Sequence, residues 1–179
     1  MNTAACTLFD TAIGRCGIAW GPNGITAFQL PEPTDAGTLR RMFRRGPALQ
    51  QVEPPADVSD AIERIVALLQ GQPIDLRDVV LDLDGIEPFH RRVYDISREI
   101  LAGQTRTYGE IATEMGAPNA SRAVGQALGA NPFAIIVPCH RVLAAGGRSG
   151  GFSAGGGVTT KLRILLIERA QIGNEPGLF

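Results

Sequence analysis

The feature that most constrains this chain is a short apolar run that leads directly into one reactive side chain. Residues 131–142 read NPFAIIVPCHRV, which places Cys139 between Pro138 and His140. An apolar run of this length predicts a buried strand or core segment, and the proline prevents a helix from continuing through it. We therefore expect a thiol fixed at the rim of a rigid core. The base His140 and the cation Arg141 beside it are neighbours that favour a low-pKa, nucleophilic thiol.

Length and composition are those of an ordinary globular chain. The sequence has 179 residues, of which 44% are hydrophobic and 20% charged, enough for one medium domain or two small ones. No apolar run approaches the roughly 20 residues that a bilayer span needs, and the N-terminus lacks the features of a signal peptide. Three widely spaced cysteines do not indicate a disulfide framework. These features predict a cytoplasmic protein that does not enter a membrane.

The net charge of −1 conceals an uneven distribution. Residues 1–88 carry 7 Arg against 12 Asp plus Glu, a net −5, whereas residues 89–179 carry 10 Lys plus Arg against 6 Asp plus Glu, a net +4. This asymmetry favours an anion, nucleic acid above all, as the partner of the second half. Two domains with differently charged, solvated faces would give the same distribution, so both interpretations remain open on charge alone.

The first half is expected to be rich in strands. Three runs of β-forming residues separated by turn sequences predict a β-meander over Cys6–Thr11, Arg15–Trp20 and Ile25–Leu30. Apolar residues at steps of three and four predict a helix over Asp57–Gln70, and a last strand is expected over Val79–Leu83. The acidic, glycine-containing segment that follows is typical of a linker. We place a domain boundary there, between residues 1–84 and 85–179.

The second half is expected to be helical. A first helix should begin at Pro88, keep Ile100 on its apolar face and be closed by Gly103. The sequence Thr107-Tyr-Gly-Glu110 has the form of a capping box and predicts the start of another helix. A further helix is expected over Ala120–Leu128. Two short helices joined by a glycine-containing break are typical of a helix-turn-helix, although most such pairs are merely packed helices.

The end of the chain combines a glycine-rich loop with a last helix. Ala144–Gly157 is dense in glycine, which indicates positive φ angles or close approach to a ligand, with disorder as the alternative. A helix is expected over Thr159–Arg169, with Leu162, Leu165 and Leu166 facing inward.

Several known uses of a cysteine do not fit the spacing around Cys139. A phosphatase loop needs an arginine six positions later, where Ala145 stands, and a redox pair needs a second cysteine close by. A papain-like protease would draw its histidine from far downstream, where there is none. A zinc site needs about four ligands, and the available cysteines and histidines have no ligand spacing, so we expect no metal. A lone cysteine in an apolar run is usually inert core, but the polar residues after it suggest that the chain reaches the surface.

The remaining motifs give this nucleophile a context. From Phe89 to Glu168 the chain resembles the O6-alkylguanine-DNA alkyltransferases, also called methylated-DNA–protein-cysteine methyltransferases. The motifs that carry the resemblance are YGEIA at 108–112, GAPNASRAVG at 116–125, NP at 131–132, IVPCHRV at 136–142, GFS at 151–153 and the Lys161 to Glu168 segment. The first half is similar only in outline. The resemblance implies an α/β (α+β) protein, with a ribonuclease H-like α/β domain over residues 1–84 and a winged-helix-like (helix-turn-helix) catalytic domain over residues 85–179.

The resemblance also implies a reaction. Cys139 would take the alkyl group from O6 of an extruded guanine in double-stranded DNA, in a single turnover and without a cofactor. His140 would remove the thiol proton through a water, and Glu168 would orient that histidine. Asn131 would brace the turn that holds the site, and Tyr108 would press on the target nucleotide and donate a hydrogen bond to the departing guanine. O4-methylthymine is a second candidate substrate.

Further positions are implied to contact the DNA and the extruded base. Arg122 would enter the base stack in place of the flipped nucleotide, with Ser121 and Ala123 beside it on the same helix. The loop residues Phe152 and Ser153, together with the backbone of Cys139 and Val142, would hold the guanine. The protein would act as a monomer.

Two other functions compete with repair. An alkyltransferase-like protein binds the lesion without reacting, but such proteins typically carry tryptophan at the position of Cys139. A helix-turn-helix regulator would bind unmodified DNA sequence-specifically. Two positions depart from the family pattern: Tyr94 stands where tryptophan is usual and Ala154 where glycine is common. The extra methyl group of Ala154 bears on the substrate range, because it would narrow the pocket for bulky adducts.

Overall fold

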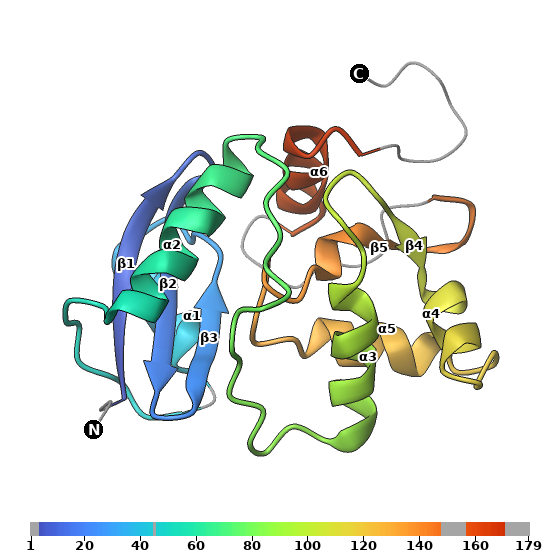
Figure 1. The fold of residues 1–179 in the computed structure, drawn as a ribbon, viewed down its shortest axis with the longest axis horizontal. Helices are drawn as coiled ribbons and strands as arrows, with labels where there is room; N and C mark the ends of the chain where they lie inside the picture. Colours follow the sequence, from blue (N-terminus) through green and yellow to red (C-terminus); the bar gives the residue numbers. More distant parts are fainter. Residues whose placement is uncertain (1–3, 45, 148–156, 171–179) are drawn as a thin grey trace.

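The protein folds into a strand-rich N-terminal half and a helical C-terminal half that lie side by side (Figure 1). The computed structural model describes residues 4–44, 46–147 and 157–170. Within these ranges the chain forms a mixed α/β structure with one three-stranded sheet and six α-helices. None of the helices in these ranges is long and apolar enough to cross a bilayer.

The N-terminal half is built on an antiparallel meander whose strands follow chain order, as predicted. The strands are β1 (Ala5–Thr11), β2 (Gly14–Gly21) and β3 (Gly24–Gln29). The β1–β2 register runs from Ala5 opposite Trp20 to Thr11 opposite Gly14, which leaves a two-residue turn. Gly14 has φ +123°, a conformation that side chains with a Cβ rarely adopt. Trp20 is buried in the core.

Two helices cover opposite faces of this sheet (Figure 1). Helix α1 (Asp35–Met42) begins at Thr34, whose side chain accepts a hydrogen bond from the Gly37 amide, and it packs against β2 and β3. A Cβ on Gly17 would lie 3.2 Å from the sulfur of Met42, so a glycine in β2 allows α1 to approach closely. Helix α2 (Ala56–Leu69) packs against β1 and confirms the helix predicted from the spacing of apolar residues.

The last strand expected in the first half is wrong in extent. Residues 79–83 form only a single bridge, between Leu81 and Ile25. The Ile25 amide donates to the Val80 carbonyl at 3.0 Å, and the Ile25 carbonyl accepts from the amide of the residue after Leu81 at 2.8 Å. The segment therefore runs parallel to the start of β3, but it pairs with β3 at this one position only. A Cβ on Gly24 would lie 2.8 Å from the Val80 carbonyl oxygen, which shows how closely the two backbones approach.

Three helices form the body of the C-terminal half. They are α3 (Pro88–Arg98), α4 (Tyr108–Glu114) and α5 (Ser121–Gly129), and they contact one another pairwise. Helix α3 is shorter than predicted. It ends with Glu99 as its C-cap, and Ile100, which was expected on its apolar face, is buried just beyond it. The buried Tyr94 hydroxyl donates to the Ala127 carbonyl at 2.9 Å and so fixes α3 against α5.

Helix α4 has the capping box that the sequence predicts. The Thr107 side chain accepts from the Glu110 amide at 3.1 Å, and the Glu110 carboxylate accepts from the Thr107 amide at 2.7 Å. After α4 the chain turns at Gly116, which has φ +75°, and then enters α5. Two short packed helices separated by a break therefore present the start of α4 and the start of α5 to the same cleft, as described below.

The apolar run is a core segment and not a strand. Phe133 to Val137 are buried, and Ile135 has a positive φ of 71° that interrupts any extended conformation. The run also joins the two halves, because the Phe28 amide of β3 donates to the Pro132 carbonyl at 2.8 Å. A single cluster of buried side chains contains members of both halves, among them Trp20 and Phe133.

The remaining elements place the reactive segment. The 3-10 helix η1 (Cys139–Arg141) leads into β5 (Val142–Leu143), which pairs in parallel with β4 (Arg106–Thr107). A second short 3-10 helix, η2, covers Ala145–Gly147. Helix α6 (Gly157–Ile167) packs against η1.

The inward face of α6 differs from the prediction. Leu165 is buried, but Leu162 is only partly buried and Leu166 is 47% exposed. Lys161 and Ile164 are buried in their place. Helix α6 therefore faces η1 with a buried polar side chain, Lys161, which a pattern of apolar residues alone could not predict.

Candidate active site

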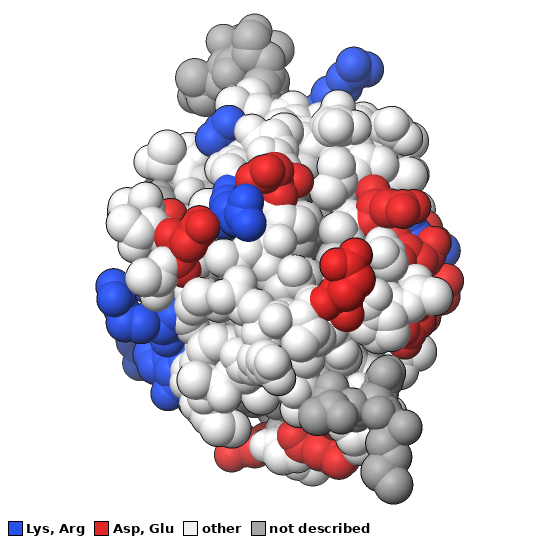
Figure 2. All heavy atoms as spheres, turned by 90° about the vertical axis from the view of Figure 1, so that its left-hand side faces the viewer, with Lys and Arg blue, Asp and Glu red and all other residues white. Residues whose placement is uncertain are grey.

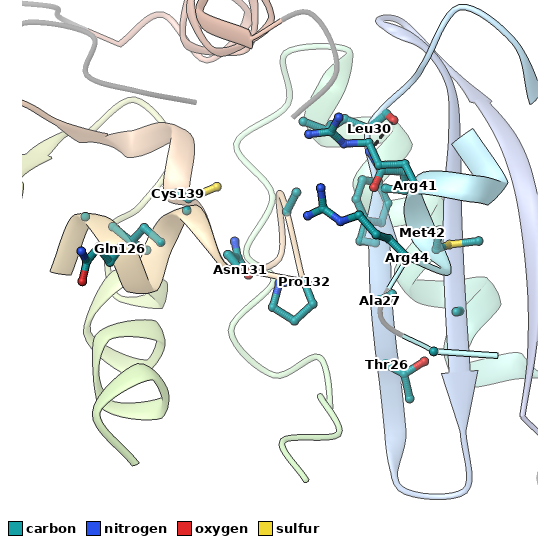
Figure 3. A pocket seen from close by; sticks show the side chains of 18 of the residues that line it. Thr26, Ala27, Leu30, Arg41, Met42, Arg44, Gln126, Asn131, Pro132 and Cys139 are labelled. Atoms are coloured by element: carbon teal, nitrogen blue, oxygen red, sulfur yellow. Dashed lines mark hydrogen bonds between the residues drawn. The ribbon is translucent and has the colours of Figure 1, made fainter. Parts of the chain in front are cut away.

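A cleft of about 1240 Å³ separates the N-terminal half from α4 and α5, and Cys139 lies in its wall. Residues of β3 and α1 line one side, and residues of α4, α5 and the segment after them line the other. Figure 3 shows Cys139 and Asn131 on the C-terminal side, facing side chains that project from the N-terminal half. The expected thiol at the rim of a core therefore opens onto a cleft.

Burial controls the protonation of Cys139. Only 9% of the residue is exposed. Burial raises the pKa of the thiol, while a hydrogen bond from the Asn131 side chain and the charge of Lys161 oppose this rise. The expectation of a low-pKa thiol is thus wrong for the resting protein. A thiol that stays protonated must lose its proton to a base before it can attack.

The neighbouring His140 has the chemistry of such a base. Its ring is completely buried, and burial lowers its pKa despite the attraction of Glu168, so the imidazole is neutral near pH 7. Its Nε2 lies 2.9 Å from Oε1 of Glu168. Because an ionised carboxylate only accepts hydrogen bonds, Nε2 carries the proton and Nδ1 carries the lone pair. Nδ1 is buried and has no hydrogen-bond partner among the described residues.

Arg141, which was expected to act on the thiol as a neighbouring cation, instead holds Glu168 from the other side. Its Nε and Nη2 donate to the two oxygens of Glu168 at 3.0 and 2.7 Å, and its Nη1 donates to the Ile100 carbonyl at 2.6 Å. Burial would raise the pKa of Glu168, but its partners His140 and Arg141 outweigh this effect and lower it to about 2. With His140 neutral, the guanidinium supplies the positive charge that keeps Glu168 ionised.

The expectation that the chain surfaces after Cys139 is also wrong. His140 and Arg141 are 0% and 6% exposed, since both turn inward to Glu168. The backbone can direct them there because η1 is a tight turn, whereas in an extended chain adjacent side chains point in opposite directions. The family resemblance predicted the contact between His140 and Glu168, whereas the contact of Arg141 with the same carboxylate was not predicted.

Asn131 is tied to the same segment by two hydrogen bonds. Its side-chain nitrogen donates to the Val137 carbonyl at 3.0 Å, and its side-chain oxygen accepts from the Phe133 amide at 2.8 Å. These bonds close the loop that carries the positive φ of Ile135. Asn131 therefore contacts both the turn before Cys139 and the thiol itself.

Tyr108 and Lys161 form the opposite side of the site. The Lys161 ammonium lies 5.9 Å from the centre of the Tyr108 ring and donates to the Val142 carbonyl at 2.7 Å. Burial lowers the pKa of Lys161 to about 8, and the Cys139 charge opposes this shift. Burial, followed by the charge of Cys139, raises the pKa of Tyr108. Tyr108 is thus a phenol that can donate a hydrogen bond near neutral pH.

Apart from Tyr108 at the start of α4, the expected DNA-contacting residues share the first turn of α5. Ser121 and Arg122 are exposed and line the cleft, whereas Ala123 is partly buried. Of the expected guanine-binding residues, Val142 is buried beside Cys139. Phe152 and Ser153 lie outside the described residues, as does Ala154.

Comparison with known proteins places this site in a family. Residues 88–170 match the family model of the "6-O-methylguanine DNA methyltransferase, DNA binding domain". The chain is 47% identical over 117 residues to a methylated-DNA–protein-cysteine methyltransferase of Mycolicibacterium paratuberculosis, which covers 65% of this chain and 68% of that protein. It is 34% identical over 156 residues to the protein of the same name from Methanothermobacter thermautotrophicus, which covers 87% of this chain and 80% of that protein.

A solved structure extends the similarity to the whole fold. The crystal structure of Mycobacterium tuberculosis OGT in complex with DNA superposes with a TM-score of 0.73 and 36% identity, covering 92% of both chains. The match therefore includes the strand-rich N-terminal half, where the sequence resemblance is only in outline. This chain belongs to the methylated-DNA–protein-cysteine methyltransferase family.

Proposed function

We propose that this protein repairs alkylated DNA directly, by moving a methyl or other alkyl group from O6 of guanine to Cys139 in a single turnover. The observation that supports this most strongly is the arrangement of a cleft-facing thiol with a neutral, carboxylate-bound histidine behind it. Base and nucleophile are supplied by adjacent residues, and the orienting acid comes from the end of α6. The relatives named above carry the same activity in their names.

The first step is removal of the thiol proton. Nδ1 of His140 carries a lone pair and is buried without a hydrogen-bond partner among the described residues, so it accepts the proton through one bridging water. The imidazolium that forms is stabilised by Glu168, which its contact with Arg141 keeps ionised. The positive charge of Lys161 stabilises the thiolate and so lowers the pKa of Cys139.

In the second step the thiolate attacks the alkyl carbon. A carbon–sulfur bond forms as the bond between that carbon and O6 breaks, and the electron pair remains on the guanine oxygen. Tyr108, whose phenol stays protonated, donates a hydrogen bond to the departing guanine and so stabilises the negative charge that develops there. The guanine anion then takes up one proton, which balances the proton that the thiol gave up to His140. The products are a thioether on Cys139 and an unmodified guanine.

On the DNA side, α4 and α5 act as a helix-turn-helix within a winged-helix-like domain over residues 85–179. The target base must leave the stack, because a base inside a duplex cannot reach a thiol in the wall of a cleft. Arg122 fills the gap left in the stack, with Ser121 and Ala123 against the adjoining backbone. Val142, Phe152 and Ser153 hold the extruded guanine. We expect a monomer that works in the cytoplasm without a cofactor, with residues 1–84 as a ribonuclease H-like α/β domain that packs against the catalytic domain.

The test is transfer of a label from DNA that carries methyl-labelled O6-methylguanine. Repair predicts that one label per chain becomes bound to the wild-type protein and none to Cys139→Ala, although this variant still binds the lesion. A wild-type protein that binds the methylated duplex but takes up no label would instead be a lesion-binding protein. Equal binding to methylated and unmethylated duplexes, without transfer, would point to a regulator.

A further inference from the structure

The cleft beside Cys139 has a second basic wall, on the N-terminal half. Its described lining includes Arg41 and Arg44 opposite Arg122, and no described lining residue is Asp or Glu. In Figure 3 the side chains of Arg41 and Arg44 project from the end of α1 into the cleft, toward Asn131 and Cys139. Positive charge therefore faces the site from both halves.

This basic wall is a local feature of a half that is acidic as a whole. Residues 1–88 have a net charge of −5, yet three of their 7 Arg fall at positions 40, 41 and 44. Figure 2 shows basic side chains gathered along one edge of the N-terminal half and acidic side chains scattered over the rest of that face. The second half is thus not the only part of the molecule suited to an anion, contrary to what the net charges suggest.

The two cleft arginines differ in whether their guanidinium groups already have an ion-pair partner in the protein. Arg41 lies 3.4 Å from Glu32, in a pair whose side chains are 32% and 19% exposed. Arg44 is exposed and forms no ion pair with the residues that the structure describes. Partly exposed ion pairs of this kind are weak and leave the guanidinium free to bind a second anion.

The size of the cleft decides what kind of anion fits. Its volume of about 1240 Å³ exceeds the roughly 300–1,000 Å³ of typical small-molecule pockets. A single extruded base would fill a small part of it. A stretch of nucleotide strand supplies both the volume and the repeated negative charge, and guanidinium groups match phosphate oxygens with paired hydrogen bonds.

We propose that Arg41 and Arg44 bind backbone phosphates of the damaged strand next to the extruded nucleotide. The N-terminal half then forms the second wall of the DNA site, opposite α5. This proposal rests on the proposed repair function and assigns a binding role to a half that the sequence motifs leave without one.

The test is the affinity for a short duplex with one O6-methylguanine, measured by fluorescence anisotropy at several salt concentrations in a Cys139→Ala background. The Arg41→Gln/Arg44→Gln pair should weaken binding about tenfold and reduce the slope of log K against log salt by about 2, close to one unit for each lost phosphate contact. The control pair Arg15→Gln/Arg40→Gln removes the same charge from the same half outside the cleft, and should change the dissociation constant less than about twofold. In case the double variant is unstable, Arg44→Glu alone should also weaken binding.

Rates separate this proposal from the repair function itself. With Cys139 restored, the Arg41→Gln/Arg44→Gln pair should slow transfer from subsaturating DNA more than transfer from free O6-benzylguanine, which has no phosphate. Equal effects of the cleft pair and the control pair on DNA affinity would overturn the role of the cleft arginines. A wild-type protein that transfers no alkyl group would overturn the repair function, a result that does not depend on these variants.

Discussion

At the scale of single residues, the protonation states in the site are set by two effects, burial and ionic contact, that act on different groups. Burial keeps Cys139 protonated and His140 neutral, whereas the contact with Arg141 keeps Glu168 ionised. Each group is therefore in the protonation state that the first step requires. Cys139 is still protonated, and His140 has the tautomer that leaves a lone pair on Nδ1 to accept the thiol proton.

His140→Gln should separate chemistry from binding. The amide cannot take up the thiol proton, so we expect the single-turnover rate of transfer to fall by about 10²- to 10⁴-fold, the usual contribution of a general base. The affinity for methylated duplex should change little, because His140 is buried behind Cys139 and away from the cleft. Parallel losses in rate and affinity would instead assign His140 a structural role.

Acid should destabilise the protein through Glu168. Its pKa is about 2 in the folded protein, against 4.5 when unperturbed, so the unfolded chain takes up this proton first as the pH falls. The stabilisation is complete above pH 4.5 and is lost as the pH falls toward 2. His140, whose pKa is lowered, acts in the same direction below its unperturbed value of 6.5.

The measurement is the free energy of unfolding in urea between pH 7 and pH 3. Wild type should lose stability steadily on acidification, and Glu168→Gln should be less stable at pH 7 but lose less below pH 4.5. Glu63→Gln, which changes an exposed carboxylate of α2, serves as the control and should keep the wild-type profile. A Glu168→Gln profile parallel to that of wild type would show that the carboxylate is not ionised through its contact with Arg141.

Sequence patterns identified the nucleophile but not its electrostatics. The spacing around Cys139 and the family motifs single out Cys139, His140 and Glu168 as one set. They could not predict the inward turn of Arg141 or the buried Lys161, because both depend on contacts between residues far apart in the chain. The pKa of the thiol follows from burial, which no local pattern of residues reports.

At the scale of elements, the orientation of α5 depends on α3. The Tyr94 hydroxyl reaches the Ala127 carbonyl, and its ring packs edge-on against Phe133 with centroids 6.4 Å apart. One side chain of α3 therefore contacts both α5 and the segment that leads to Cys139. Tyrosine at this position supplies a hydrogen bond where the family usually has tryptophan.

Tyr94→Phe tests this contact. The ring packing stays and the hydrogen bond is lost, and Ala127 keeps a second bond from the Ala130 amide at 3.2 Å. We expect a loss of about 0.5–1.5 kcal/mol in the free energy of unfolding, measured by urea denaturation, and little change in the rate of transfer at saturating DNA. A large loss of rate without loss of stability would mean that Tyr94 acts on the site more directly.

Elements marked by a local sequence pattern were predicted correctly. Elements that depend on contacts with distant parts of the chain were not. The meander, α2 and the capping box of α4 follow from turn residues, periodicity and a hydroxyl–carboxylate pair. The expected strand over Val79–Leu83 failed because strand pairing depends on the course of a neighbouring backbone. The prediction of the buried face of α6 was wrong because that face includes Lys161, whose side chain contacts the site and not the apolar core.

At the scale of the whole molecule, the two halves share one core. Buried side chains from β1–β3, α2, α3 and the apolar run form a single cluster, and β3 is hydrogen-bonded to Pro132. Neither half buries its apolar surface alone, so both should unfold in one cooperative transition. The cleft is then a fixed feature of a single body.

The protein contains a single tryptophan, Trp20, in β2 of the N-terminal half. Its fluorescence reports unfolding of that half, whereas far-ultraviolet circular dichroism is dominated by helices, most of them in the other half. We expect the two signals to give the same midpoint in urea. Separate midpoints would show that the halves unfold independently and that the cleft walls can move apart.

The central claim is that Cys139 becomes the permanent acceptor of the alkyl group, and intact-protein mass spectrometry after incubation with excess O6-methylguanine duplex tests it most directly. We expect a mass increase of one methyl group per chain that does not rise further with time, located by peptide mapping on Cys139. We also expect restored guanine in the DNA. An unchanged protein mass beside restored guanine, or a methyl group on any other residue, would contradict the account.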